Sequence, residues 1–223
     1  HIRIGAAVTS AELGEHDTVK ALLPGLVEAV DLIGSAQVQG RATVGGNLCN
    51  ASPAADSVPA LIAAGAVAKV AGPGGLRAVG VEDFLVGPSQ TNLGENEFVV
   101  SLDIPRPPAR SADAYLRFIP RTEMDIAVVG AGAAVTLDAN GTCTAARLAL
   151  GAVAPTARLV PDAAAAMIGN KIDDSVLASV AVSARSACNP IDDKRGTVAF
   201  RIHVAGVLAT RAVKIALRRA ETK

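Results

Sequence analysis

The stretch Ala-Thr-Val-Gly-Gly-Asn-Leu-Cys-Asn-Ala-Ser-Pro-Ala-Ala-Asp-Ser-Val-Pro, residues 42–59, decides the fold of this chain. It places a glycine pair, Gly45 and Gly46, among small polar side chains and one carboxylate, and an apolar run over 60–67 follows. Glycines permit positive φ and let a ligand come close to the backbone. Successive amide N–H groups in such a turn form a concave site for an anion. The stretch therefore predicts a phosphate-binding loop, with a plain tight connection as the alternative.

The side chains of this stretch supply further hydrogen-bonding groups. Asp56 stands where a helix over 56–64 is expected to begin. It either caps that helix or accepts hydrogen bonds from a polar ligand, and the two roles are compatible. Hydroxyl and amide groups are present at Thr43, Asn47, Asn50 and Ser52.

Outward from this loop, the first part of the chain mixes short strands and helices. Residues 106–111 hold two adjacent prolines, which resist both a helix and a central strand. They predict a boundary between domains at 1–108 and 109–223. In the first domain, hydrophobic periodicity predicts strands over 2–8, 66–71, 76–79 and 98–104. It predicts helices over 17–33, 56–64 and 81–85, the first of them bent at Pro24.

The second domain reads as strands followed by helices. Asn140-Gly141 is a strong hairpin signal between two of the strands. This order predicts an antiparallel three-stranded sheet with helices on one face, which makes the chain an α+β protein. The strands are expected over 115–119, 127–137 and 143–151, and the helices over 157–168, 175–187 and 198–220.

Composition argues against several classes of protein. The 223 residues carry 21 basic and 21 acidic side chains, and this zero net charge disfavours nucleic acid and anionic membranes as partners. The longest apolar run, 126–135, is too short to span a bilayer. The 3 cysteines form no Cys-x-x-Cys pair, so we expect no metal site and a reducing, cytoplasmic compartment.

Five blocks along the chain together carry a family resemblance. Their order in the sequence is the family order, and they extend from about residue 4 to the C-terminus. The chain resembles the FAD-binding medium subunits of molybdenum hydroxylases, the family of xanthine dehydrogenase and aerobic carbon monoxide dehydrogenase. The blocks are 4–13 with Ile4-Gly5-Ala6, 41–59 with Arg41-Ala42-Thr43-Val44-Gly45-Gly46-Asn47-Leu48, 97–105 ending in Ile104-Pro105, 117–127 with Met124-Asp125-Ile126-Ala127, and 192–201 with Asp192-Asp193-Lys194-Arg195.

The resemblance implies a set of FAD contacts and no catalytic or metal-binding residue. Val99 or Val100 flanks the isoalloxazine, with ordinary strand core as the alternative. Arg117 matches a basic position that stabilises negative charge on the reduced flavin, with a solvated strand residue as the alternative. Ile33-Gly34 resembles a turn near the cofactor, although a helix C-cap is the favoured interpretation there. The implied contacts to phosphates and ribityl are Thr43, Val44, Gly45, Gly46 and Asn47, with Asn50 and Asp56 close by.

The implied function is electron transfer within a larger complex. A large partner subunit carries molybdopterin, and a small one carries [2Fe–2S] clusters that pass electrons to FAD in this chain. FAD then delivers them to NAD, oxygen or a quinone. The family has an earlier Ala-Gly-Gly-Thr type loop that this sequence lacks, so we expect a fragment without the N-terminal FAD subdomain. Two alternatives stay open: a cofactor-free assembly subunit and a stand-alone flavin oxidase.

Overall fold

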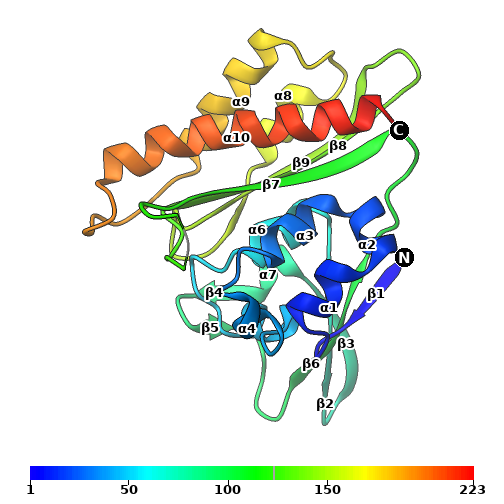
Figure 1. Cartoon of the computed structure of the whole chain (residues 1–223), viewed down its shortest axis with the longest axis vertical. Coiled ribbons are helices and arrows are strands. Elements are labelled where there is room, and N and C mark those ends of the chain that lie inside the picture. Colours follow the sequence, from blue (N-terminus) through cyan, green and yellow to red (C-terminus); the bar gives the residue numbers. More distant parts are fainter. Residues whose placement is uncertain (123) are drawn as a thin grey trace.

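Two antiparallel four-stranded sheets organise the chain, one in each half (Figure 1). The structure is a computed structural model and describes residues 1–122 and 124–223. None of the helices within these ranges is long and apolar enough to cross a membrane. The strands are β1 Ile2–Gly5, β2 Val67–Gly72, β3 Gly75–Gly80, β4 Leu85–Gly87, β5 Gln90–Thr91, β6 Phe98–Ile104, β7 Ser111–Phe118, β8 Val129–Leu137, β9 Cys143–Gly151 and β10 Arg158–Leu159.

Short helices dominate the first half of the chain and longer ones the second half. The longest, α10, has 24 residues and begins at Thr197, whose side chain accepts a hydrogen bond from the amide of Phe200. The helices are α1 Ser10–Glu15, α2 Asp17–Leu22, α3 Pro24–Val30, α4 Ala36–Gln39, α5 Val44–Cys49, α6 Ser57–Ala63, α7 Val81–Phe84, α8 Pro161–Met167, α9 Asp174–Ser186 and α10 Val198–Glu221.

The first sheet has the strand order β1-β6-β2-β3. Its apolar side chains, such as Ala68 and Leu102, belong to one core that also contains residues of α3, α5 and α6, and α5 contacts β6 directly. A small separate pair, β4 and β5, lies at the edge of this half. This half of the fold supports the glycine-rich segment, residues 42–59.

The second sheet has the order β10-β9-β8-β7. Side chains alternate along a strand, so Ala131, Ala133 and Val135 of β8 face the same side. They share a core with the small residues of α10, which is the face covered by α8, α9 and α10. This confirms the predicted antiparallel sheet whose own three helices lie on one face. The short strand β10 adds a fourth member where the sequence predicts the start of a helix.

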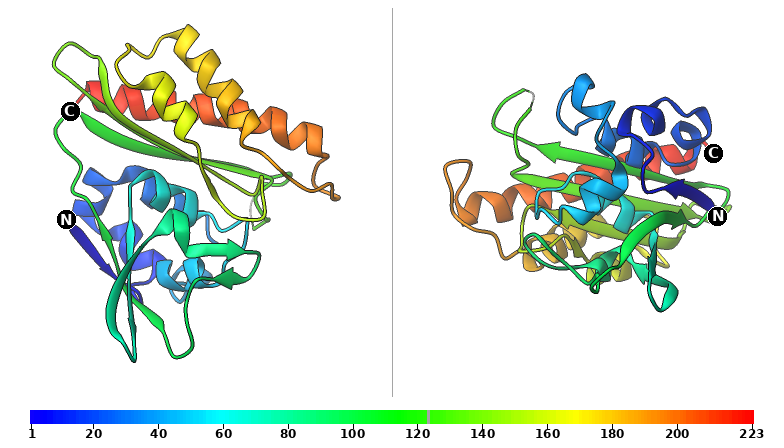
Figure 2. Two further views of the ribbon diagram at one scale, coloured as in Figure 1. Left: turned by 180° about the vertical axis from the view of Figure 1, so that it is seen from behind. Right: turned by 90° about the horizontal axis from the view of Figure 1, so that it is seen from below.

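The opposite face of the second sheet rests on α3 and α6 of the first half (Figure 2). Glycines allow this close approach. A Cβ added to Gly25 of α3 would lie 2.7 Å from the backbone nitrogen of Ala114 in β7. A Cβ added to Gly132 of β8 would lie 2.6 Å from the carbonyl oxygen of Pro59 in α6. The two halves therefore pack as one body, with the sheet sandwiched between two helical layers.

Several elements differ from the prediction because of local backbone chemistry. The single helix expected over 17–33 is two helices, since Leu23 leaves the helical region at φ −133° and Pro24 starts α3. Proline suits the first turn of a helix, where no amide donor is needed. The Asn140-Gly141 hairpin is present with a longer loop, in which Gly141 has φ +81°. The amide of Asp138 donates to the carbonyl oxygen of Thr142, and the carbonyl oxygen of Asp138 accepts from the amide of Gly141. The domain division at 108 and 109 stays a prediction.

Candidate functional site

The glycine-rich segment forms a helix rather than an irregular loop. Thr43 is the N-cap of α5, and its Oγ1 accepts a hydrogen bond of 2.9 Å from the amide of Gly46. The amide of Asn47 donates to the carbonyl oxygen of Thr43. The amides of Val44 and Gly45 have no hydrogen-bond acceptor among the described residues. One amide of the predicted anion cradle is therefore satisfied internally, and two at the helix N-terminus are not.

The two glycines meet different surroundings. Gly45 is buried, and a Cβ there would lie 2.6 Å from the carbonyl oxygen of Ala6. It is a packing glycine that lets α5 approach the segment after β1. Gly46 is exposed, and a Cβ there would meet only Thr43 Oγ1, at 2.9 Å. A ligand can therefore approach the backbone at Gly46 and not at Gly45.

Asn47 joins α5 to the start of α6. Its Oδ1 accepts hydrogen bonds from the hydroxyl of Ser57 at 2.6 Å and from the amide of Ser57 at 3.4 Å. This contact orients the Asn47 side chain and fixes the turn that carries Asp56. Ser57 is fully buried. It is not among the predicted site residues, because a serine after an aspartate at a helix start carries no distinctive signal.

Asp56 occupies the N-cap position of α6, but its side chain caps nothing. Its carboxylate turns to β7 instead, where Oδ1 accepts from the hydroxyl of Tyr115 at 2.8 Å and Oδ2 from Nη1 of Arg117 at 2.9 Å. Burial raises the pKa of Asp56, while the charge of Arg117 and the two hydrogen bonds oppose that rise. Because both oxygens are satisfied by donors, the group is a structured ion pair rather than a helix cap.

Arg117 is not the solvated strand residue of the alternative interpretation. Its side chain is 6% exposed, and Nη1 also donates to the carbonyl oxygen of Leu32 at 2.9 Å. Within the described chain, Nε and Nη2 of Arg117 have no hydrogen-bond acceptor, and neither atom is among the buried polar atoms that lack a partner. The guanidinium therefore keeps donors that face open space.

Arg117 borders a polar pocket of about 470 Å³. Its walls come from Leu32 to Gly34, from the residues around α5 and the turn before α6, from Arg117, and from the segment after β7 with Arg195 opposite. Gly34 has φ +63°, but the C-cap of α3 is Asp31, three residues earlier, so the favoured interpretation of Gly34 as the C-cap is wrong. Gly34 lines the pocket, and its contact with the cofactor stays a prediction.

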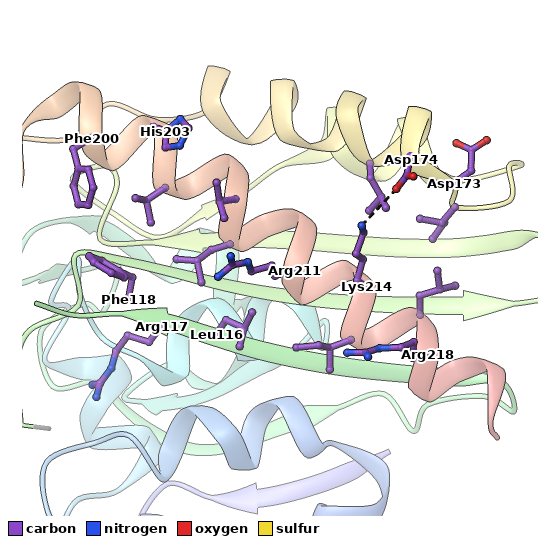
Figure 3. Close-up of a pocket in the computed structure, with 17 residues that line it drawn as sticks. Leu116, Arg117, Phe118, Asp173, Asp174, Phe200, His203, Arg211, Lys214 and Arg218 are labelled. Atoms are coloured by element: carbon purple, nitrogen blue, oxygen red, sulfur yellow. Dashed lines mark hydrogen bonds and ion pairs between the residues drawn. The ribbon is translucent and has the colours of Figure 1, made fainter. Parts of the chain in front are cut away.

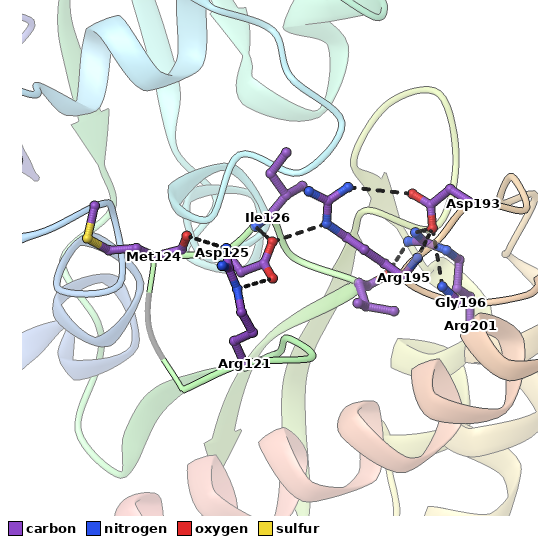
Figure 4. Close-up of polar contacts among 9 residues, drawn as sticks. Arg121, Met124, Asp125, Ile126, Asp193, Arg195, Gly196 and Arg201 are labelled. Atoms are coloured by element: carbon purple, nitrogen blue, oxygen red, sulfur yellow. Dashed lines mark hydrogen bonds and ion pairs between the residues drawn. The ribbon is translucent and has the colours of Figure 1, made fainter.

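A network of charged side chains forms the far wall (Figure 4). Asp125 Oδ2 accepts from Arg121 Nε at 3.0 Å. Asp125 Oδ1 accepts from Arg195 Nε at 3.1 Å. Asp193 Oδ1 accepts from Arg201 Nη2 at 2.8 Å, and Arg201 also donates to backbone oxygens. The arginines of this wall are thus each paired with a carboxylate, and the segment after β7 is tied to the start of α10.

The structure brings only some of the predicted site residues together at this pocket. Asn47, Asn50, Asp56 and Arg117 line it. Val99 lies in the core at 7% exposure, opposite Val70 of the neighbouring strand, and Val100 is 42% exposed on the other face. Flavin contact by these valines stays a prediction, as it does for the remaining members of the set, Thr43, Val44, Gly45 and Gly46, which lie along α5 outside the pocket lining.

A larger hollow lies elsewhere, as a groove of about 1100 Å³ along α10 (Figure 3). It is mostly apolar, with Arg211, Lys214 and Arg218 along the helix and Phe118 and Phe200 at one end. The two phenylalanine rings meet edge to face at 5.7 Å. Apart from Arg117, it shares no residue with the polar pocket.

Comparison with known proteins finds a different protein family in each half of the chain. The family described as "FAD binding domain in molybdopterin dehydrogenase" matches residues 1–107. The family described as "CO dehydrogenase flavoprotein C-terminal domain" matches residues 114–216. Both matches follow the order of the two sheets along the chain.

Individual relatives cover nearly the whole chain. The carbon monoxide dehydrogenase medium chain of Hydrogenophaga pseudoflava is 33% identical over 217 residues, which is 97% of this chain and 75% of the relative. The xanthine dehydrogenase FAD-binding subunit of Escherichia coli O157:H7 is 29% identical over 223 residues, which is 100% of this chain and 76% of the relative.

Solved structures show the same likeness in three dimensions. Carbon monoxide dehydrogenase from Oligotropha carboxidovorans superposes with a TM-score of 0.93 at 31% identity, over 97% of this chain and 75% of that one. Quinoline 2-oxidoreductase from Pseudomonas putida 86 superposes with a TM-score of 0.87 at 30% identity, over 98% and 75%. The chain therefore belongs to the family of FAD-binding medium subunits of molybdenum hydroxylases, the oxidoreductases of the carbon monoxide and xanthine dehydrogenase type.

Proposed function

We propose that this chain holds the isoalloxazine end of FAD at the polar pocket and serves as the relay between partner iron–sulfur clusters and a final electron acceptor. Membership of the family supports FAD as the cofactor. The observation that carries the position is the guanidinium of Arg117, which borders the pocket with two nitrogens that no described residue engages. A flavin offers carbonyl oxygens at one edge of its ring, and such donors suit them.

The residues around the pocket fit FAD. Bound FAD supplies the redox chemistry. Arg117 donates hydrogen bonds and a positive charge, and Asp56 fixes the guanidinium from behind through its 2.9 Å contact. The exposed backbone at Gly46 leaves room for the phosphate-bearing part, and Asn50 is exposed beside it. No residue of this chain is assigned acid or base chemistry on an organic substrate.

The relay requires partners, and we propose two. A large subunit carries the molybdopterin cofactor and oxidises the organic substrate, while a small subunit carries [2Fe–2S] clusters and delivers electrons to FAD in this chain. The names of the two relatives, "medium chain" and "FAD-binding subunit", support an assembly of several chains. NAD, oxygen and a quinone are the proposed acceptors.

Titration of the chain with FAD tests the cofactor site. We expect saturable quenching of flavin fluorescence with one FAD per chain. Gly46→Val is expected to abolish binding, because its side chain occupies the exposed approach to the backbone. Gly74→Val is the matched control, since a Cβ at Gly74 meets nothing within 4 Å. Absence of binding by the unchanged chain would favour the cofactor-free assembly subunit.

The relay itself is tested with the loaded complex. Reduction of the [2Fe–2S] subunit is expected to bleach the flavin absorbance of this chain, and the colour is expected to return when the true acceptor is added. NAD, oxygen and a soluble quinone are offered one at a time. Turnover of an organic substrate by the isolated, flavin-loaded chain would contradict the relay and support a stand-alone oxidase.

A further inference from the structure

Tyr115 is a buried residue that contacts Asp56, a residue of the polar pocket's wall, and the proposed function gives it no role so far. It lies on β7 at 2% exposure, and its hydroxyl donates to Asp56 Oδ1 at 2.8 Å. Residues two apart on a strand share a face, so Tyr115 and Arg117 reach Asp56 side by side. The carboxylate is held at both oxygens, by a phenol and by a guanidinium.

The surroundings of the phenol are built to place its hydroxyl. Gly130 of β8 is paired with Arg117 across the two strands, and a Cβ there would lie 2.5 Å from the Tyr115 hydroxyl oxygen. No other residue type leaves that space. The backbone amide of Tyr115 donates to Glu28 Oε2 of α3 at 2.9 Å, which fixes the strand at this point. The hydroxyl therefore has one position and one acceptor.

We propose that Tyr115 is a positioning residue of the flavin site: it holds the Asp56 carboxylate turned toward Arg117 and thereby sets both the direction and the effective charge of that guanidinium. The proposal rests on the proposed function. Asp56 and Arg117 together carry no net charge, so a bound flavin meets oriented donors and a largely compensated positive charge. Loss of the phenol hydroxyl removes one of the two restraints on the carboxylate.

The physical consequence follows from burial. Without the Tyr115 hydroxyl, Asp56 Oδ1 stays in a side chain that is 9% exposed and has no donor. A buried carboxylate with fewer hydrogen bonds is protonated more readily. Protonation removes the negative charge beside Arg117, and the uncompensated guanidinium then favours the reduced flavin. The charged groups that face this cluster are Arg117 on β7, Glu28 on α3, and Arg121, Asp125 and Arg195 across the pocket.

The midpoint potential of bound FAD is the first test. Tyr115→Phe is expected to raise the potential, and the pH at which the potential changes is expected to move upward. Asp56→Asn is expected to raise the potential at every pH at which Asp56 is ionised in the unchanged chain. If Tyr115 acts through Asp56, Tyr115→Phe shifts the potential no further in the Asp56→Asn background.

A matched control separates positioning from simple folding effects. Thr136→Val removes a hydroxyl that donates to Ser111 on the same sheet, away from the pocket. It is expected to change the melting temperature without shifting the flavin potential. An equal shift from Tyr115→Phe with and without Asp56, or no shift at all, overturns the proposal.

A second test needs no flavin, because this chain has one tyrosine and no tryptophan. The ultraviolet signal of tyrosine ionisation therefore reports Tyr115 alone. Burial and the charge of Asp56 raise the pKa of this phenol well above its usual value. Asp56→Asn removes the charge, so the alkaline onset of the signal is expected to move to lower pH.

The two tests distinguish failure of this proposal from failure of the proposed function. An unchanged tyrosine titration in Asp56→Asn overturns the contact between Tyr115 and Asp56, whether or not FAD binds. A chain that binds no FAD but shows the expected titration shift overturns the flavin role and keeps the contact. If Tyr115→Phe does not fold, the titration of the Asp56→Asn protein decides the matter.

Discussion

Gly45 and Gly46 are neighbours in sequence with opposite reasons to be glycine. Gly45 touches Ala6 inside the fold, whereas Gly46 faces the exterior. We expect Gly45→Ala to lower the free energy of unfolding by about 1–3 kcal/mol, since a methyl group forced against backbone must displace it. Gly46→Ala displaces only the Thr43 hydroxyl and is expected to cost less. Urea unfolding of the two variants checks this, and equal losses would contradict it.

The ion pair between Asp56 and Arg117 predicts a second difference at this scale. Removal of one partner of a buried pair leaves an uncompensated charge, so Arg117→Ala is expected to destabilise the fold by about 3 kcal/mol. It is also expected to lower the potential of bound flavin, because Asp56 alone repels added negative charge. Addition of Asp56→Asn to Arg117→Ala is expected to restore part of both losses. Chemical unfolding and redox titration measure them, and a double variant no better than the single one would refute the coupling.

At the scale of the element, helix caps explain where the C-terminal helices begin. Asp173 Oδ1 accepts from the amides of Ser175 and Val176 at the start of α9. Asp173→Ala is therefore expected to cost about 1 kcal/mol. Asp174 is the matched control, because its side chain is 97% exposed and its ion pair with Lys214 spans 3.5 Å. Such surface pairs contribute little. Thermal unfolding that ranks Asp174→Ala as the worse variant would contradict the cap assignment.

One cap comes from far away in the sequence. Helix α3 begins after Leu23 without a side-chain cap of its own, and Asp113 Oδ1 of β7 accepts from the amide of Gly25 at 3.0 Å instead. The second sheet thus completes a helix of the first half. This contact joins the two halves beside the glycine packing at Ala114.

At the scale of the whole molecule, Asp113 predicts how stability depends on pH. Burial raises the pKa of this carboxyl from 3.8 to about 6, with the Gly25 amide opposing and Glu28 adding to the rise. Between these values the folded chain holds more protons than the unfolded one. Stability from this group therefore falls as pH rises from 3.8 to about 6, by roughly 3 kcal/mol, and is level above that.

Urea unfolding between pH 4 and pH 7, with Asp113→Asn as the comparison, isolates this contribution, the pH range being set by the pKa of about 6. Carboxylates whose pKa is lowered, such as Asp103 and Asp193 beside their arginines, give the opposite slope in both proteins. The unfolding free energy of the unchanged chain minus that of Asp113→Asn is expected to fall with rising pH and then to stay constant. A signed difference that rises with pH would show that Asp113 is ionised more readily in the fold than in the unfolded chain.

Local signals predicted most of the second half of the chain. Strand β9 lies at the predicted residues 143–151. Helix α10 begins at the predicted residue, Val198, and α9 begins at Asp174, one residue before the predicted start. Long periodic segments bury one face, so their pattern survives folding. Short segments of the first half misled: α1, α4 and α5 are helices of 6, 4 and 6 residues that were not predicted. Such helices depend on caps and packing more than on propensity.

The amino-acid sequence by itself determined the family and the α+β class, because both follow from short blocks of fixed spacing. It also predicted Asn47, Asp56 and Arg117 as site residues, and these three line one pocket. Only the tertiary structure decided how those residues meet. It turned Asp56 from a helix cap into the partner of Tyr115 and Arg117, 59 and 61 residues away. A side chain at a helix start chooses between local amides and distant donors by burial, and burial exists only after the sheet has closed over the helix.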